Sequence, residues 1–294
     1  MRTILLFSTL TLLLAACDLY KQDAYVEQYV VDSWLVAQSE LPPINLSKTA
    51  PIDAVYNRSE LGVTDASIVV KEIDANGSTN WVEVYQHVSN GRYEPIDASR
   101  LVKPGTRYEL EVITGPENHL ITAYTVVPDT FSVRSLNSTR LPYQGPEQFT
   151  VTLTASENIV RQTYFVVSTE TLDPQNAELT PFYANFDVDR DELFRVSSGI
   201  FNENNQNQSG SGEVELVYPW IGIAFYGPNR IVIASIDDNA YDFIRSSQTQ
   251  IGGGTQSPGE IENLLYRIEG GIGIFGSYAE VTIDVEVDKP PFQQ

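Results

Sequence analysis

The stretch that decides the fold runs from residue 66 to residue 91 and reads ASIVVKEIDANGSTNWVEVYQHVSNG. A run rich in β-branched residues ends before Asn76-Gly77, and a second run, with alternating apolar residues, ends before Asn90-Gly91. Valine and isoleucine favour strands, and Asn-Gly between two such runs indicates a hairpin, because both residues tolerate the positive φ of a tight turn. The stretch therefore predicts two antiparallel strands followed by a further turn.

Strand signals continue on both sides of this hairpin. Further strands are predicted at residues 27–36, 44–49, 103–112 and 119–127. Pro128 ends the last of them, since proline cannot donate to a β-ladder. Several short strands with regular turns over about 100 residues are typical of an immunoglobulin-like β-sandwich. We therefore predict such a sandwich over residues 25–128.

The rest of the chain, residues 129–294, is predicted to form a second β-rich domain. Strands are predicted at residues 149–154, 163–167, 221–226, 230–236 and 279–287. Residues 238–246 predict a short helix that Asp238 can cap, with Tyr241 and Ile244 on one face. The predicted fold class is thus mainly β: an N-terminal immunoglobulin-like sandwich, then a β-rich domain with one or two short helices.

The first seventeen residues indicate export. Arg2 precedes an apolar stretch that ends in small residues, which is the layout of a secretory signal. The stretch is too short for a transmembrane helix, which needs about 20 apolar residues. Residues 14–17, LAAC, resemble the lipobox of bacterial lipoproteins, in which the thiol is alkylated with diacylglycerol and the new amine is acylated. We predict a signal peptide at residues 1–16, lipidation of Cys17 and a tether at 17–24.

Cysteine usage supports this interpretation. Cys17 is the only cysteine among 294 residues. An ordinary secreted protein with a chance cysteine is the alternative, but one thiol placed at the end of the signal is better explained by lipidation. Three acyl chains would anchor the protein firmly, because each buried CH₂ contributes about 0.8 kcal/mol.

The charge balance restricts the partners. The chain has 18 Lys and Arg against 39 Asp and Glu, a net charge of −21. Such a surface repels nucleic-acid phosphates and anionic lipid headgroups. We therefore predict no nucleic-acid partner and expect neutral, cationic or metal-bridged ones. Solubility alone explains most of these charges equally well.

Three aspartates are candidate ligands for calcium. Asp187, Asp189 and Asp191 have the opening spacing of a calcium loop. An EF-hand would need glycine and glutamate where Glu192 and Ser198 stand, so that motif is excluded. A looser calcium site stays open beside the favoured interpretation, solvated acids on one strand face. No other cofactor is predicted apart from the covalent lipid.

Catalytic signals are few, and we predict no enzymatic activity. The two histidines are His87, within a predicted strand, and His119, beside a turn. No Gly-x-Ser-x-Gly elbow accompanies them. Paired carboxylates for glycoside cleavage stay open in so acidic a chain. Trp220, which follows Tyr218-Pro219, is predicted to be more exposed than the strand tryptophans and to contact a ligand or partner.

A glycine-rich stretch near the C-terminus, residues 270–276, reads GGIGIFG. A nucleotide loop needs a following helix, and here a strand follows. Two interpretations remain. One is a close-packed strand or bulge where backbone approaches backbone, which we favour. The other is a partner-docking edge, with Phe275 as the contact residue.

Three parts of the chain together resemble a known family. They are residues 29–35 with 46–51, residues 91–93 with 103–110, and residues 270–276. They resemble a family of Bacteroidota outer-membrane lipoproteins of unknown function, whose genes often lie beside those of SusC-type TonB-dependent receptors. The resemblance covers nearly the whole mature chain. It implies the two β-rich domains predicted above, and it carries over no catalytic residues.

The resemblance also implies a role and a location. It implies a non-enzymatic accessory subunit of a TonB-dependent transporter complex, acting in substrate capture or complex assembly, with other surface lipoproteins as further partners. The expected location is the outer membrane, lipid-anchored and facing the cell exterior. Asp18 and Asp23 after the lipidated cysteine partly match a surface-export signal. The alternative is a stand-alone surface lipoprotein that binds a glycan or peptide.

We expect mass spectrometry of the native protein to find a mature chain that starts at Cys17 and carries diacylglyceryl and N-acyl groups. The small residues before Cys17 leave the peptide bond accessible to the signal peptidase, and the thiol has no other cysteine with which to pair. A free thiol at Cys17, or a start at another residue, would contradict the predicted anchor.

Overall fold

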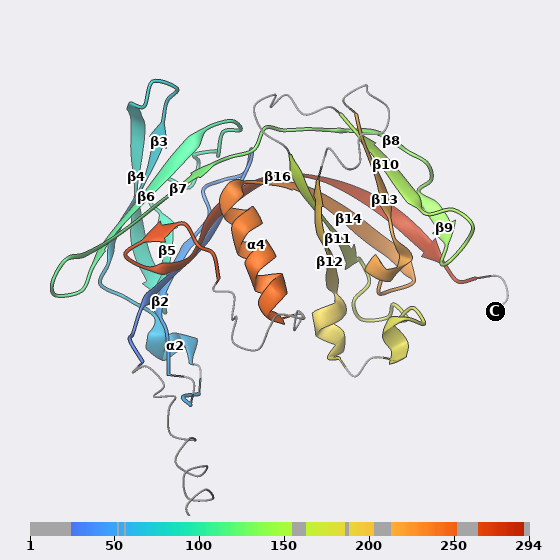
Figure 1. Cartoon of the computed structure of the whole chain (residues 1–294), viewed down its shortest axis with the longest axis horizontal. Helices are drawn as coiled ribbons and strands as arrows, with labels where there is room; N and C mark the ends of the chain where they lie inside the picture. The colour runs from blue at the N-terminus through green and yellow to red at the C-terminus, as the bar shows by residue number, and fades with distance from the viewer. Residues whose placement is uncertain are drawn as a thin grey trace, which may run out of the picture.

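A computed structural model describes residues 25–51, 53–55, 57–154, 163–185, 188–202, 213–251 and 264–290. The chain is mainly β, as predicted (Figure 1). In the part of the chain that is described, the α-helices are α2 (Arg58–Leu61) and α4 (Asp238–Ile251).

The N-terminal half contains the first seven strands. They are β1 (Tyr29–Val36), β2 (Ile44–Lys48), β3 (Ser67–Ile73), β4 (Thr79–Ser89), β5 (Arg92–Pro95), β6 (Arg107–Thr114) and β7 (His119–Val126). The predicted hairpin is confirmed, because β3 and β4 pair antiparallel with Val69 opposite Val84. Both turns use positive φ as expected, 83° at Gly77 and 74° at Gly91.

The described residues of the C-terminal half add nine strands and three short 3₁₀ turns. The strands are β8 (Val133–Leu136), β9 (Arg140–Pro142), β10 (Phe149–Leu153), β11 (Tyr164–Thr171), β12 (Arg195–Asn202), β13 (Val214–Tyr218), β14 (Gly227–Ile236), β15 (Ile268–Glu269) and β16 (Ile272–Asp288). The 3₁₀ turns are η2 (Tyr183–Asn185), η3 (Arg190–Leu193) and η4 (Trp220–Gly222).

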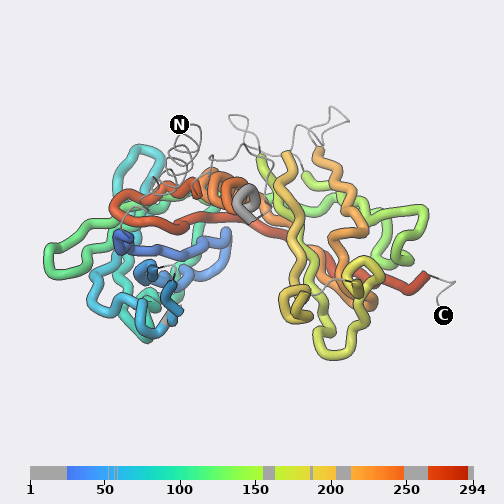
Figure 2. The backbone as a smooth tube through the Cα atoms, turned by 60° about the horizontal axis from the view of Figure 1, so that its bottom comes forward, coloured from blue at the N-terminus to red at the C-terminus, as the bar shows by residue number. Residues whose placement is uncertain are grey.

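One curled sheet passes through both halves. Its strand order is β12-β11-β14-β16-β1-β2-β5-β4-β3-β6-β7-β15, and β9 pairs with β16 beside this path. A second sheet, β13-β10-β8, lies at the end of the molecule opposite β3 and β4 (Figures 1 and 2). The C-terminal half is therefore a sandwich of two sheets, whereas the N-terminal half curls a single sheet around its core.

The long strand β16 connects the two halves. Its first part, from Ile272 to Tyr278, pairs parallel with β1, and its second part pairs antiparallel with β14. The change of partner falls at Tyr278, which lies opposite Val36 on one side and Ile236 on the other. In Figure 2 the strand runs as a continuous red tube between the halves.

Each half has its own hydrophobic core. The first core uses the buried alternate residues of β6 that period-two patterning predicts, Tyr108, Leu110 and Val112. It also contains Ile268 and Phe275 from near the C-terminus. The second core lies between the small sheet and β11, β14 and β16. The boundary placed at Pro128 therefore separates most residues of the two cores, but the C-terminal segment contributes to both.

One predicted strand, at residues 221–226, is wrong. Its first residues belong to η4, and Phe225 makes an isolated bridge to Leu179. The Tyr218 hydroxyl donates to the Gly222 carbonyl (2.9 Å), and its ring occupies the space that a side chain at Gly222 would need. The apolar run indicated a strand because it is buried, but the Tyr218–Gly222 contact closes a turn instead.

The favoured interpretation of the glycine-rich stretch, a close-packed strand, is confirmed. Gly273 has φ of 107°, and a Cβ there would lie 2.1 Å from the carbonyl oxygen of Val31 on β1. Gly270 is similar, with its Cβ position 2.2 Å from the Leu120 carbonyl oxygen. Only glycine lets the backbone approach its neighbours this closely at these two positions.

We therefore expect Gly273→Ala to destabilise the protein by about 3 kcal/mol or more, because it combines backbone strain with a steric clash. Gly199→Ala is the matched control, since Gly199 on the edge strand β12 has nothing within 4 Å of its Cβ position. That change should be neutral or stabilise by roughly 0.5 kcal/mol. Denaturant unfolding of both variants measures the difference, and equal stabilities would contradict the packing described.

Candidate functional site

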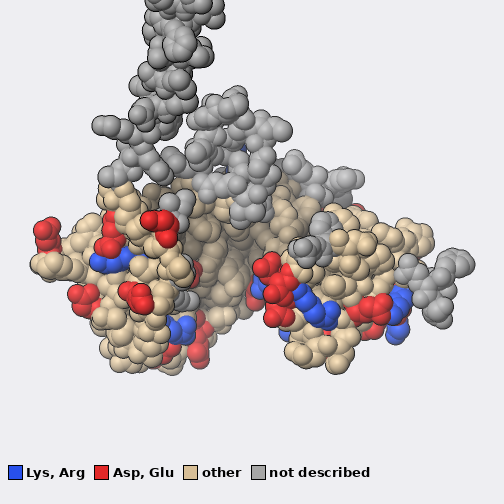
Figure 3. Space-filling model, turned by 90° about the horizontal axis from the view of Figure 1, so that it is seen from below, with Lys and Arg blue, Asp and Glu red and all other residues tan. Residues whose placement is uncertain are grey.

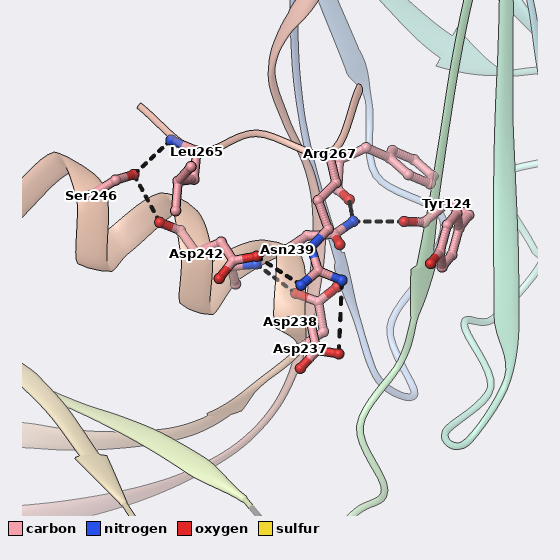
Figure 4. Close-up of polar contacts among 10 residues, drawn as sticks. Tyr124, Asp237, Asp238, Asn239, Asp242, Ser246, Leu265 and Arg267 are labelled. Carbon is pink, nitrogen blue, oxygen red and sulfur yellow. Dashed lines mark hydrogen bonds and ion pairs between the residues drawn. The ribbon is translucent and has the colours of Figure 1, made fainter. Parts of the chain in front are cut away.

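The two halves meet at the N-terminus of α4 (Figure 4). The Asn239 side-chain amide donates to the carbonyl oxygens of Tyr124 on β7 (2.6 Å) and Phe275 on β16 (2.8 Å). The first turn of the helix is therefore fixed to two strands that border the N-terminal core. The predicted helix is confirmed and extends to Ile251.

A buried carboxylate precedes this helix. The Asp237 side chain accepts from the Ala240 N–H (2.8 Å) and from the Thr125 hydroxyl (2.5 Å), and the residue is 2% exposed. Because the Thr125 hydroxyl has one proton, the Ser277 hydroxyl must donate to Thr125 (2.5 Å) while Asp237 is ionised. Burial raises the pKa of Asp237, although these hydrogen bonds oppose the increase.

The prediction that Asp238 caps the helix is wrong, because Asp237 is the cap. Either of two adjacent aspartates fits the sequence rule for capping. The choice depends on which carboxylate the fold buries against Thr125 and Ser277, and these strands are distant in sequence. Asp238 instead lies 4.0 Å from the Arg267 guanidinium.

Arg267 attaches the segment after the helix to α4 (Figure 4). Its guanidinium contacts the Asp242 carboxylate at 2.8 Å. The Leu265 N–H donates to the Ser246 hydroxyl (2.9 Å), which forms a second link. The same segment continues into β15, where Ile268 pairs with Ala123 of β7. Residues 264–269 therefore form a wall between α4 and the edge of β7.

This wall borders a surface cleft of about 510 Å³. Its lining residues come from β6, β7 and the 264–269 segment: Arg107, Glu109, Thr122, Ala123, Tyr124, Tyr266, Arg267, Ile268 and Glu269. The volume falls in the range of small-molecule sites. We call this the β6–β7–β15 cleft.

The cleft combines aromatic rings with fixed polar groups. Tyr124 and Tyr266 are 42% and 40% exposed. The Arg107 guanidinium lies 4.0 Å from the centre of the Tyr124 ring and also contacts Glu109 at 2.8 Å. The lining contains two arginines and two glutamates, so their charges balance. Such a surface can hold a polar ligand by ring contacts and hydrogen bonds.

A second, shallower cleft of about 350 Å³ lies beside the start of β14 and the end of β16. Two of its carboxylates already have cationic partners: Asp288 contacts Arg140 (2.7 Å) and Glu178 contacts Lys289 (2.5 Å). Among the described residues, no group of three or more His, Cys, Asp or Glu is arranged to hold a metal ion. The first cleft is therefore the stronger candidate for ligand binding.

Two of the calcium candidates, Asp189 and Asp191, lie at η3. Asp187 falls outside the described residues. The Asp189 carboxylate accepts from the Asp191 N–H (3.2 Å) and caps η3. Local capping thus explains the position of Asp189.

The two predicted contact residues are buried. Trp220 is 8% exposed, and its ring packs against Tyr143 (5.5 Å between centroids) and Phe149 (5.9 Å) in the second core. The predicted exposure of Trp220 is wrong, because η4 turns its side chain inward. Phe275 is 1% exposed and belongs to the first core.

The two histidines discussed in the sequence analysis pack against other residues of the fold. His119 Nε2 makes a 2.6 Å hydrogen bond with the Gly270 carbonyl, and its ring lies 5.1 Å from that of Tyr29. His87 packs edge-on against Tyr93. Cys17 lies outside the described residues.

Sequence reasoning missed the β6–β7–β15 cleft. Alternation along β7 places Tyr124 on the outer face, which was a usable local signal. Nothing local indicates that Tyr266 and Arg267 lie beside it, about 140 positions later in the sequence.

Comparison with known proteins identifies the family. The chain belongs to the family described as a domain of unknown function, DUF4249, whose model matches residues 18–284. No curated protein matches the sequence. No helix among the described residues is long and apolar enough to cross a membrane.

Several solved structures are distantly similar. Trypsin-activated alpha-2-macroglobulin from Escherichia coli is 11% identical, with a TM-score of 0.24, over 76% of this chain and 15% of that one. Salmonella alpha-2-macroglobulin reacted with methylamine is 12% identical, with a TM-score of 0.25, over 93% of this chain and 16% of that one. The chain thus spans about a sixth of the length of these proteins.

Replacing Asp237 should separate its role as a hydrogen-bond acceptor from the effect of its buried charge. Asp237→Ala removes the acceptor for Thr125 and Ala240, and we expect a loss of about 1–3 kcal/mol. Asp237→Asn keeps a capping oxygen without the buried charge, so it should be much milder at neutral pH.

The raised pKa of Asp237 also sets the direction of the pH dependence. Its stabilising contribution is complete below the unfolded pKa, about 3.9, and is lost as pH rises through the higher folded pKa. The stability of the wild type relative to Asp237→Asn should therefore fall from acid to neutral pH. Denaturant unfolding across that range tests this, and a constant difference would contradict the burial argument.

Proposed function

We propose that this protein is a lipid-anchored, non-enzymatic accessory subunit that works beside a SusC-type TonB-dependent transporter in the bacterial outer membrane. The observation that carries the proposal is the lipobox-like sequence at residues 14–17, which holds the only cysteine of the chain. The matched family region begins at residue 18, so it lies within the predicted mature chain. The proposed location is the outer face of that membrane.

The β6–β7–β15 cleft supports a role in substrate capture. It lies beside the segment that follows α4. Arg107 and Glu109 of β6 pair with each other, and Arg267 pairs with Asp242 of α4, so these charged groups are held in place. Fixed donors and acceptors reduce the entropic cost of binding a ligand. An accessory subunit could hold a polar cargo there before the cargo reaches the transporter.

Native co-purification tests the accessory role. We expect an affinity-tagged full chain, isolated from detergent-solubilised outer membranes, to bring a TonB-dependent receptor with it. Cys17→Ala is the matched control, because it removes the predicted anchor and leaves the folded residues unchanged. A wild-type protein that always elutes alone would overturn the proposal.

A second candidate function is stand-alone ligand binding at the cell surface, which the exposed aromatic rings of the cleft favour. We expect Tyr124→Ala and Tyr266→Ala to weaken binding of an oligosaccharide or peptide by about tenfold, since each removes a ring contact of roughly 1.4 kcal/mol. Val126→Ala is the control, because Val126 is also exposed on β7 but does not line the cleft.

Calorimetric titration of the unlipidated mature chain against oligosaccharide and peptide panels measures this second function. Binding without any transporter, lost in the tyrosine variants and kept in the control, would favour it. If no panel member binds, or if Val126→Ala weakens binding as much as the tyrosine variants, the candidate fails.

A further inference from the structure

We infer that one end of the molecule rests on the lipid bilayer, with Val26 and Val55 in contact with the headgroup region. This end consists of the chain before β1, the end of β2 and the loop that leads into α2. The inference rests on the proposed lipid anchor at Cys17, and it adds which surface of the folded body faces the membrane.

The length of the tether limits the position of the body. Eight peptide links separate Cys17 from Tyr25, so the two Cα atoms lie at most roughly 28 Å apart. Tyr25 is the first described residue, and the bilayer must therefore lie within that distance of it. The small sheet lies at the far side of the molecule from α2 (Figure 1), beyond β16.

The attachment point is fixed on the body. The Tyr25 hydroxyl donates to the Thr49 carbonyl oxygen (2.5 Å), and the Gln28 N–H donates to the Thr49 hydroxyl oxygen (3.1 Å). The Thr49 N–H in turn donates to the Gln28 carbonyl (2.9 Å). These bonds hold the start of the described chain against the end of β2, so the tether leaves from one defined place.

The same end exposes apolar side chains. Val55 is 93% exposed, the highest value among the large apolar residues that the structure describes, and Val26 is 73% exposed. Tyr25 is 47% exposed and combines a ring with a polar hydroxyl. Exposed aliphatic and tyrosine side chains next to a lipid anchor suit the interface between headgroups and acyl chains.

The loop that carries Val55 begins with a local turn and rejoins β2 after α2. Before it, the Ala54 N–H donates to the Pro51 carbonyl (3.0 Å). After it, the Val63 N–H donates to the Leu46 carbonyl (3.0 Å), which ties the segment that follows α2 to β2. Val55 therefore lies on a segment that leaves the end of β2 and returns to the same strand.

Charge at this end favours neutral headgroups. Lys48 and Glu27 form an ion pair at 2.7 Å, whereas Asp53 and Glu60 are exposed acids. Figure 3 views the molecule from below, and acidic side chains, with fewer basic ones, are scattered among uncharged ones over the N-terminal half. Anionic lipid would repel these acids, so the contact should be closest on zwitterionic phosphatidylcholine.

Single-cysteine labelling of the lipidated full chain tests the inference. Once Cys17 is acylated, an introduced cysteine is the only free thiol. Val26→Cys and Val55→Cys receive an environment-sensitive fluorophore. Val188→Cys and Val217→Cys are matched controls, because both valines are exposed, at 42% and 46%, on the other half of the protein.

The labelled proteins are reconstituted in phosphatidylcholine vesicles with and without a shallow nitroxide-labelled lipid. We expect the nitroxide to reduce emission at positions 26 and 55 by about two-fold or more, as for side chains within the interface. Emission at positions 188 and 217 should stay unchanged. Replacing part of the phosphatidylcholine with phosphatidylglycerol should weaken the quenching.

The experiment distinguishes a wrong membrane-facing surface from a missing lipid anchor. Mass spectrometry and co-sedimentation with vesicles first establish that the protein is acylated and bound. If bound protein shows equal quenching at all four positions, or stronger quenching at 188 or 217, the bilayer contacts another surface and the inference is overturned while the anchor stands. If the protein carries no lipid and does not sediment, the proposed function and this inference both fail.

Discussion

The structure depends on the backbone pairing of β16 with two different partners. Buried N–H and C=O groups need hydrogen-bond partners, and β16 obtains them from β1 along its first part and from β14 along its second. Because the strand is continuous through Tyr278, neither half can rotate freely about it. Gly273 makes the close parallel contact with β1 possible, because any side chain at this position would clash with β1.

The polar groups at the joint follow from this arrangement. Where β16 changes partner, Ser277, Thr125 and Asp237 meet in a buried, hydrogen-bonded chain, and Asn239 attaches α4 to both neighbouring strands. Buried polar networks rigidify a structure when every member is satisfied. The adjacent segment with Arg267 then forms the wall of the β6–β7–β15 cleft, so the geometry of the candidate site depends on the joint between the halves.

Local signals in the sequence predict most of the strands but little of the site. The Asn-Gly hairpin, the alternation in β6 and the helix that begins at Asp238 are confirmed because each depends on neighbouring residues. The predicted exposure of Trp220 and the predicted strand at 221–226 are wrong. A short run of apolar residues can be buried either in a strand or in a turn, and the sequence pattern does not distinguish the two. The cleft, the capping Asp237 and the double pairing of β16 arise from contacts between distant segments, which no local pattern records.

The pairing of β1 with β16 also has a consequence for biogenesis. Residues near 30 must wait for residues near 272 before that side of the sheet closes, and a chain is synthesised from its N-terminus. Until then, β1 presents an open edge, the kind of surface on which strands from other chains can add. Such long-range closure is slow, and incompletely folded chains aggregate. Binding by a holdase chaperone should therefore protect the open edge of β1 until the last strand is available to pair with it.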